Sequence, residues 1–135
     1  MTDAIKLTVP RQKSYYGVVR LVVGGLAARL DLSYEYLEDV QLALESLLAN
    51  DAYAASGEIT IELAASPGVV QILVGPLDGG RLRPDLADDA DDAAGVSLGR
   101  LLSTVVGAVG VEERDGTQWV RLEKRMPGAG MAAEA

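Results

Sequence analysis

The stretch LEDVQLALESLLAND, residues 37–51, carries three polar side chains that could take part in chemistry: Glu45, Ser46 and Asn50. A carboxylate, a hydroxyl and an amide oxygen are groups that can hold a magnesium ion and its water at a nucleotide site. The same residues also suit the polar side of an amphipathic helix, which needs no ligand. The choice between these alternatives depends on whether Glu45 and Asn50 share one side of a helix.

Two residue types that commonly carry chemistry are missing from the chain. Its 135 residues include no cysteine and no histidine, which excludes disulfides, thiolate nucleophiles, imidazole acid–base catalysis and the commonest zinc ligands. Any catalysis would therefore rest on carboxylates, lysine, arginine, hydroxyls or a bound cation.

The chain is acidic, with a formal charge of −8 from 20 acidic and 12 basic residues. Such a surface repels a phosphate backbone, so we expect no direct binding of nucleic acid, and a basic protein is the favoured partner. No uncharged apolar run reaches about 18 residues, and the N-terminus lacks a signal-peptide pattern. We expect a cytoplasmic protein without membrane association, with one domain over 1–126 and a disordered tail over 127–135.

The spacing of apolar residues predicts the elements that must position these side chains. Five segments are strand-like: 4–10, 57–65, 69–75, 110–114 and 117–124. Three segments have helical spacing: 11–30, 34–53 and 97–109. Residues 76–95 are predicted to form a long loop. This order predicts an α+β fold, a two-layer sandwich with about three helices on one face of a mixed, mainly antiparallel five-stranded sheet.

That order, together with several local strings, resembles the RsbW-type anti-sigma-factor serine/threonine kinases of the gyrase, histidine-kinase and heat-shock-chaperone (GHKL) ATPase superfamily. The strings are LTVP before a helix with VVR at 18–20, DLSYEYLEDVQLAL followed by Asn50, GVSLGRLL, and DGTQWVRLEKR. The likeness runs from Ile5 to about Arg125. It implies the histidine kinase-like ATPase fold, ATP and Mg²⁺ as cofactors, a sigma factor or an anti-sigma antagonist as partner, and pairing into a homodimer.

In this family a glutamate and an asparagine four residues apart activate the attacking group and hold magnesium. The resemblance implies Glu45 as the catalytic base and Asn50 as the metal ligand, although here they are five residues apart. Five steps of about 100° put them about 140° apart around a regular helix. A π-bulge could bring them together; otherwise Glu45 is a solvated residue on the helix flank.

The family's adenine motif, D-x-G-x-G, corresponds to GPLDGG at 75–80, and the resemblance implies nucleotide contacts by Asp78 and Gly80. Two registers are open. If Gly80 is the second glycine, Pro76 takes the aspartate position; if Asp78 is the aspartate, Leu82 takes the position of the second glycine. The alternative is an Asp-Gly-Gly turn that only ends a strand.

Further nucleotide contacts are implied for Gly95 and Ser97, which match the phosphate-binding turn at a helix start, and for Gly116 and Thr117, which match the last G-T pair. Five aspartates in DLADDADDAAG, just before that helix, would oppose a triphosphate. We therefore expect a retained fold with weakened or lost ATP binding.

Two functions follow from this interpretation, beside the simpler alternative of a stand-alone α+β domain that only dimerises. One is a protein-interaction regulator that binds a sigma factor or antagonist, with Tyr15 and Tyr16 as candidate anchors. The other is an active serine kinase, in which Glu45 is the base, Asn50 holds magnesium and residues 76–95 close over ATP.

Overall fold

The computed structural model describes residues 3–87 and 97–125, and within them it forms two layers, a sheet and a layer of helices. The strands are β1 (Asp3–Pro10), β2 (Glu58–Ser66), β3 (Val69–Leu77), β4 (Ala108–Arg114) and β5 (Thr117–Arg125). The helices are α1 (Lys13–Arg29), α2 (Tyr34–Leu48), α3 (Gly79–Ala87), α4 (Leu98–Val106) and the short 3₁₀ helix η1 (Asp51–Tyr53).

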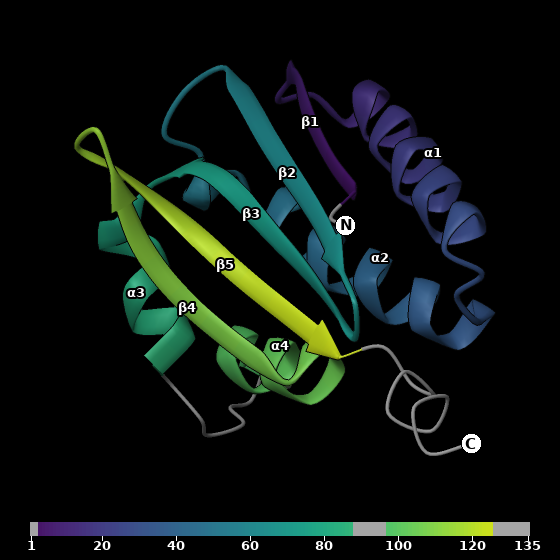
Figure 1. The fold of residues 1–135 in the computed structure, drawn as a ribbon. Helices are drawn as coiled ribbons and strands as arrows, with labels where there is room; N and C mark the ends of the chain where they lie inside the picture. The colour runs from purple at the N-terminus through teal and green to yellow at the C-terminus, as the bar shows by residue number, and fades with distance from the viewer. Residues whose placement is uncertain (1–2, 88–96, 126–135) are drawn as a thin grey trace.

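The strands pair in the order β1-β2-β3-β5-β4, and all four pairings are antiparallel. Figure 1 shows the helices gathered behind the sheet, so that none of the helices in the described residues covers its other face. The predicted α+β class and the five-stranded sheet are confirmed. The described ladders contain no parallel pair, so the sheet is more regular than the predicted mixed one.

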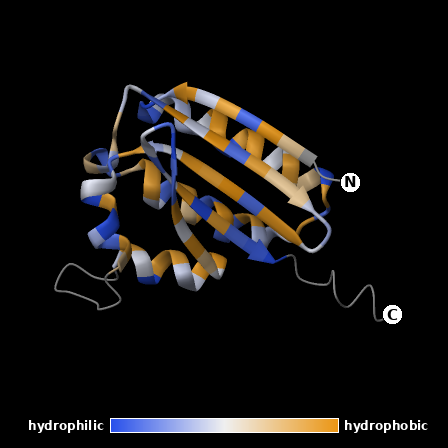
Figure 2. Ribbon diagram, turned by 60° about the vertical axis from the view of Figure 1, so that its left-hand side comes forward, coloured by the Kyte–Doolittle hydropathy of each residue, from blue (hydrophilic) through white to orange (hydrophobic). Residues whose placement is uncertain are grey.

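The core lies between the two layers. Alternate residues of β2, such as Ile59 and Ile61, point toward the helices and have no exposed surface. They meet residues of α2 at helical spacing, such as Leu44 and Leu47. Figure 2 shows hydrophobic positions, in orange, recurring along both the strands and the helices. Apolar residues recur every two positions along the strands and about every 3.6 positions along the helices. Each element therefore has one apolar face, and the two layers bury these faces against each other.

The second helix begins where the sequence predicts, but it ends earlier. The Ser33 side chain accepts a hydrogen bond from the Tyr36 backbone N–H, which caps the start of α2. The predicted end at Tyr53 is wrong, because α2 stops at Leu48 and Asn50 has an extended backbone. The Asn50 Oδ1 atom accepts from the Ala52 N–H at 2.9 Å, and such local bonds compete with helix continuation.

The predicted loop over 76–95 is wrong in its first half. Strand β3 continues to Leu77, and α3 follows at Gly79–Ala87. This helix is short and contains Pro84, yet Leu82 is completely buried and Leu86 packs against the core. Their spacing of four residues forms one apolar stripe, which explains why the segment folds back onto the body. Residues 88–96 and the predicted tail lie outside the described residues.

The third predicted helix, 97–109, is also shorter than expected. Gly107 takes a φ of 100°, a conformation open to glycine, and ends α4 at Val106. Strand β4 therefore begins at Ala108 and already pairs there with β5. Among the described residues, no helix is long and apolar enough to cross a membrane.

Candidate functional site

Glu45 lies on the surface between α1 and α2, where its Oε1 atom contacts Nη1 of Arg20. The Arg20 side chain also lies 4.0 Å from Glu38, and each of these three side chains is nearly half exposed. A pair this exposed contributes little to stability. The predicted catalytic base is thus engaged with an arginine of the first helix, and α2 contains no π-bulge that would turn it toward Asn50.

Asn50 lies past the end of α2, at the turn into η1. Its Oδ1 atom is bonded to the Ala52 N–H, and its carbonyl oxygen accepts from Nη2 of Arg11 at 3.0 Å. The same Nη2 donates to the Leu47 carbonyl at 3.2 Å. The C-terminal end of a helix carries a partial negative charge, so the positive Arg11 guanidinium stabilises this turn at the end of α2. The separation of Glu45 from Asn50 therefore arises from the end of the helix rather than from the angle around it.

Tyr53 connects this turn to the end of β3 and to α3. The Asp78 N–H donates to the Tyr53 carbonyl at 2.8 Å, and the Tyr53 hydroxyl donates to Asp85 Oδ2 at 2.5 Å. Burial, followed by the bond to Asp85, raises the pKa of Tyr53 to about 12, while the Asn50 side chain acts in the opposite direction. The structure thus brings Asn50, Asp78 and Asp85 together around one buried tyrosine.

Tyr53 and Asp85 were not among the residues singled out from the sequence. Asp85 was counted only as one of the aspartates of a loop. The spacing of Leu82 and Leu86 was the signal that could have revealed a helix there, and a helix fixes the direction in which Asp85 points.

Asp78 and Gly80 form the start of α3. The Asp78 Oδ1 atom accepts from the Gly80 N–H at 3.0 Å, and the Asp78 carbonyl accepts from Leu82 N–H. Both residues are exposed. This is the geometry of an Asp-Gly-Gly turn that opens a helix; the adenine contact stays a prediction.

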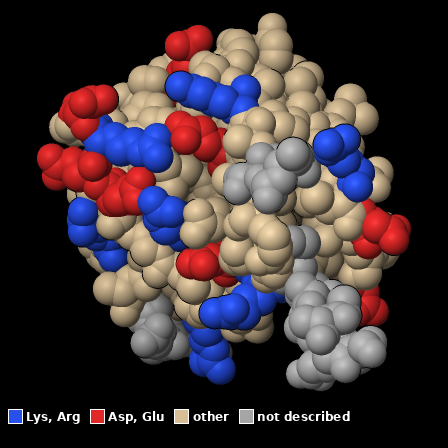
Figure 3. Space-filling view, in the orientation of Figure 1, with Lys and Arg blue, Asp and Glu red and all other residues tan. Residues whose placement is uncertain are grey.

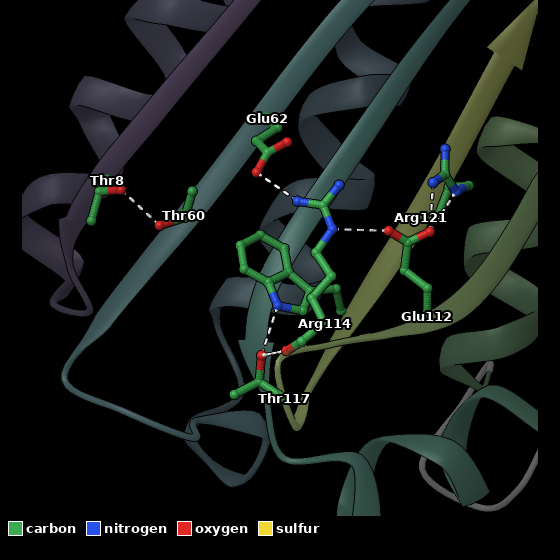
Figure 4. A network of polar contacts seen from close by, with 8 residues as sticks. Thr8, Thr60, Glu62, Glu112, Arg114, Thr117 and Arg121 are labelled. Atoms are coloured by element: carbon green, nitrogen blue, oxygen red, sulfur yellow. Dashed lines mark hydrogen bonds and ion pairs between the residues drawn. The ribbon is translucent and has the colours of Figure 1, made fainter.

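The remaining predicted contacts lie in two other places. Ser97 caps α4 by accepting from the Arg100 N–H at 3.3 Å, and Gly95 lies outside the described residues. Gly116 turns the chain from β4 to β5 at a φ of 79°. Thr117 donates to the Arg114 carbonyl at 2.6 Å and accepts from Trp119 Nε1 at 2.9 Å (Figure 4).

A cavity of about 430 Å³ lies between α3, α4 and β4. Its lining includes Arg83, Leu86, Ser103 and Gly110. None of the predicted nucleotide contacts that fall in the described ranges lines it. The predicted contacts therefore do not converge on this hollow.

The helix-free face of the sheet carries a network of charged side chains. Arg114 contacts Glu62 at 2.8 Å and Glu112 at 3.1 Å, and Arg121 contacts Glu112 at 2.5 Å. The bond from Arg121, then that from Arg114, lowers the pKa of Glu112. Figure 4 shows these side chains meeting above the strands, and Figure 3 shows basic and acidic groups side by side on this face. The face is polar, and four of its charged residues, Glu62, Glu112, Arg114 and Arg121, are paired with one another.

The outer face of α1 is apolar instead. Tyr15, Val18 and Leu21 follow one another at helical spacing, and Leu42 of α2 lies exposed as well. Leu21 has 78% of its surface exposed, far more than a leucine that packs within its own chain. We call these four residues the α1 patch. Exposed apolar side chains that gather on one surface mark sites of protein interaction, and α1 and α2 pack against each other.

Two buried tyrosines predict how stability depends on alkaline pH. Tyr36 donates to the Lys124 carbonyl at 2.7 Å, and burial raises its pKa to about 12, as it does for Tyr53. Unfolded tyrosine ionises near pH 10, so the unfolded chain gives up protons first. The free energy of unfolding should therefore be unaffected by these groups below about pH 9. It should fall between about pH 10 and 12, by up to about 1.4 kcal/mol per pH unit for each tyrosine.

Urea unfolding at a series of pH values checks this expectation. The double variant Tyr36→Phe/Tyr53→Phe should be less stable at neutral pH but should lose stability more slowly above pH 10. Equal slopes in the wild type and the double variant would contradict the assignment.

Comparison with known proteins gives one consistent likeness. The chain is 28% identical over 133 residues to the serine-protein kinase RsbW of Halalkalibacterium halodurans, an alignment that covers 84% of this chain and 78% of that protein. RsbW of Bacillus subtilis is 29% identical over 77 residues, covering 53% of this chain and 48% of its own length. RsbW of Listeria monocytogenes is 36% identical over 67 residues, covering 46% and 43%. In these two alignments the chain spans about half of the relative.

A solved structure, that of the RsbU and RsbW domains of Rv1364c from Mycobacterium tuberculosis, has the same fold. It superposes with a TM-score of 0.65 at 16% identity, covering 92% of this chain and 32% of that longer chain. No protein-family model matches the sequence. The RsbW alignments, the sheet order and the helix layer together make this chain similar to the RsbW-type serine-protein kinases, and the solved structure shows that it has the fold of an RsbW domain.

Proposed function

We propose that this protein is an anti-sigma-type regulator that binds a sigma factor or an anti-sigma antagonist, and that its ATP binding and kinase activity are weakened or lost. The observation that carries the proposal is the α1 patch. It offers one aromatic and three aliphatic side chains to solvent on neighbouring helices. The buried core of a protein interface is more apolar than its rim, and tyrosine is one of the residues that contribute most to binding energy there.

Charges border the α1 patch. Arg20, Glu38 and Glu45 form a half-exposed group between α1 and α2. A polar border around an apolar centre is the usual anatomy of a protein interface, and the border sets which partner fits. In this proposal Glu45 belongs to the polar border of a protein interface, a role that requires no bound nucleotide.

The proposed loss of kinase activity is supported by the bonds that the candidate residues already make. Glu45 is paired with Arg20, Asn50 Oδ1 is bonded to a backbone N–H, and Asp78 caps α3. To bind magnesium and adenine, each group would have to exchange a bond inside the protein for one to the ligand. Phosphoryl transfer depends on positioning, so groups that must first rearrange lose most of their effect.

The second candidate is an active ATP- and Mg²⁺-dependent serine kinase acting on an anti-sigma antagonist. It is favoured by the relatives, which are named serine-protein kinases. In that case Asn50 would hold the ion, and Asn50, Asp78 and Gly80 would contact the nucleotide together with Ser97, Gly116 and Thr117. An amide oxygen such as that of Asn50 is a suitable donor for Mg²⁺, and Glu45 would be the base.

Calorimetric titration with MgATP separates the two candidates. We expect no detectable heat, or a Kd weaker than about 1 mM, because the candidate ligands are engaged inside the protein. Asn50→Ala is the matched control and should behave like the wild type. Micromolar binding that Asn50→Ala abolishes would overturn the proposed loss and favour the kinase.

Affinity capture tests the binding function. The purified chain is immobilised and exposed to extract of its native host, and the retained proteins are identified by mass spectrometry. We expect a sigma factor or an anti-sigma antagonist among the proteins eluted. Retention of neither, by a chain that remains folded, would overturn the proposal.

A further inference from the structure

The hydrogen bond between Tyr53 and Asp85 joins two elements that are 32 residues apart in sequence. Tyr53 is only 3% exposed, and its hydroxyl reaches the carboxylate at 2.5 Å. A bond from a hydroxyl to a charged acceptor is stronger than one between neutral groups. It is therefore a strong polar link between η1 and α3.

On the side of η1 the link is fixed to the rest of the fold. The Tyr53 carbonyl accepts from the Asp78 N–H at 2.8 Å, and Ala54 forms a bridge with Leu77 at the end of β3. Arg11 holds the preceding turn through the Asn50 carbonyl. These bonds tie η1 to the sheet and to α2, so Tyr53 is a firm anchor.

On the other side, α3 is a weak helix by itself. It has nine residues, begins with Gly79 and Gly80, and contains Pro84. Glycine and proline disfavour helix, and a helix this short is unstable in isolation. The helix therefore depends on tertiary contacts, chiefly the buried Leu82 and the bond from Arg83 Nε to Gln118. Elements held in this way open locally when one contact is lost.

We propose that Tyr53 and Asp85 form a clasp that holds α3 closed against η1, and that α3 opens as a unit when the clasp is released. The clasp joins η1 to the second half of α3, whereas the residue before α3 is held separately by the bond from the Asp78 N–H to the Tyr53 carbonyl. A ligand or partner that binds the Asp85 carboxylate would therefore release α3 while Asp78 stays attached to η1. This proposal rests on the contacts of α3 and does not depend on the proposed function.

Chemical labelling of a buried thiol tests the clasp. Because the chain has no cysteine, Leu82→Cys places a single reporter beneath α3, where the leucine is fully buried. Its rate of reaction with a thiol reagent under native conditions measures how often α3 opens. In this background Tyr53→Phe should raise the rate by about tenfold or more, since losing a bond to a charged group costs at least that factor.

Tyr36→Phe is the matched control, because it removes another buried tyrosine hydroxyl bond, to the Lys124 carbonyl, away from α3. Urea unfolding of every variant allows the part due to global unfolding to be subtracted. After this correction Tyr36→Phe should leave the labelling rate unchanged. Equal rates for Tyr53→Phe and Tyr36→Phe would overturn the proposal.

A double-mutant cycle gives a second readout. Asp85→Ala should accelerate labelling as much as Tyr53→Phe, and the double variant should label no faster than either. If the rate increase in the double variant equals the product of the increases in the two single variants, Tyr53 and Asp85 act independently. That result would overturn the proposed clasp.

Discussion

Replacing Gly99 with alanine should lower the free energy of unfolding by about 3 kcal/mol, the upper end of the usual cost of overpacking. Gly99 is in the first turn of α4, where the helix passes directly against α3. A Cβ atom at this position would lie 2.1 Å from the Leu86 carbonyl oxygen and 2.8 Å from its carbonyl carbon. Backbone atoms cannot rotate away, so one of the two helices must shift.

The control for this substitution is Gly25→Ala in α1. No atom of a neighbouring element lies within 4 Å of the Cβ that it would add. Alanine is favoured over glycine inside a helix by about 1 kcal/mol, so this variant should be slightly more stable than the wild type. Both values come from urea unfolding at neutral pH. A loss below about 1 kcal/mol for Gly99→Ala would mean that α3 and α4 are not packed as closely as described.

Replacing Leu21 with glutamate should abolish most partner binding without harming the fold. Leu21 is the most exposed apolar residue of the α1 patch, at 78%, so a charge there costs the isolated protein little. In a complex the same charge would be buried against the partner. Loss of a central interface side chain costs about 2 kcal/mol or more, which is about 30-fold in Kd.

The measurement is a binding titration of the captured partner with the wild type and with Leu21→Glu. Urea unfolding curves confirm that the two proteins are equally stable. Tyr34→Glu serves as the matched control, because Tyr34 is 74% exposed but lies at the start of α2, outside the α1 patch. It should bind like the wild type. Equal affinities for Leu21→Glu and the wild type would place the interface elsewhere.

Local patterns in the sequence were enough to predict the sheet and the main helices. Each strand shows its inward face by alternation, as Ile59 and Ile61 do in β2, and Ser33 marks the start of α2 by its capping side chain. Such signals are short-range, because they depend on which residues share a face and on bonds within one turn. They were sufficient for the fold class and for the family likeness.

The site was predicted less well, because its geometry depends on where elements end. The sequence placed Asn50 inside a helix and Asp85 in a loop. In the structure Asn50 follows α2, and Asp85 lies on a helix and reaches Tyr53. Continuing a helix and leaving it differ by about 1 kcal/mol per residue, too little for local sequence to decide.

The sequence by itself determined the alternation of the strands, the apolar stripes of the long helices, the acidic charge and the absence of cysteine and histidine. The tertiary structure decided the end of α2, the existence of α3 and the neighbours of Glu45. These outcomes depend on contacts between residues far apart in the chain, such as Arg11 with Asn50, Arg20 with Glu45 and Tyr53 with Asp85. Such contacts exist only after the layers have packed, and the buried ones, together with the packing itself, then outweigh local preference.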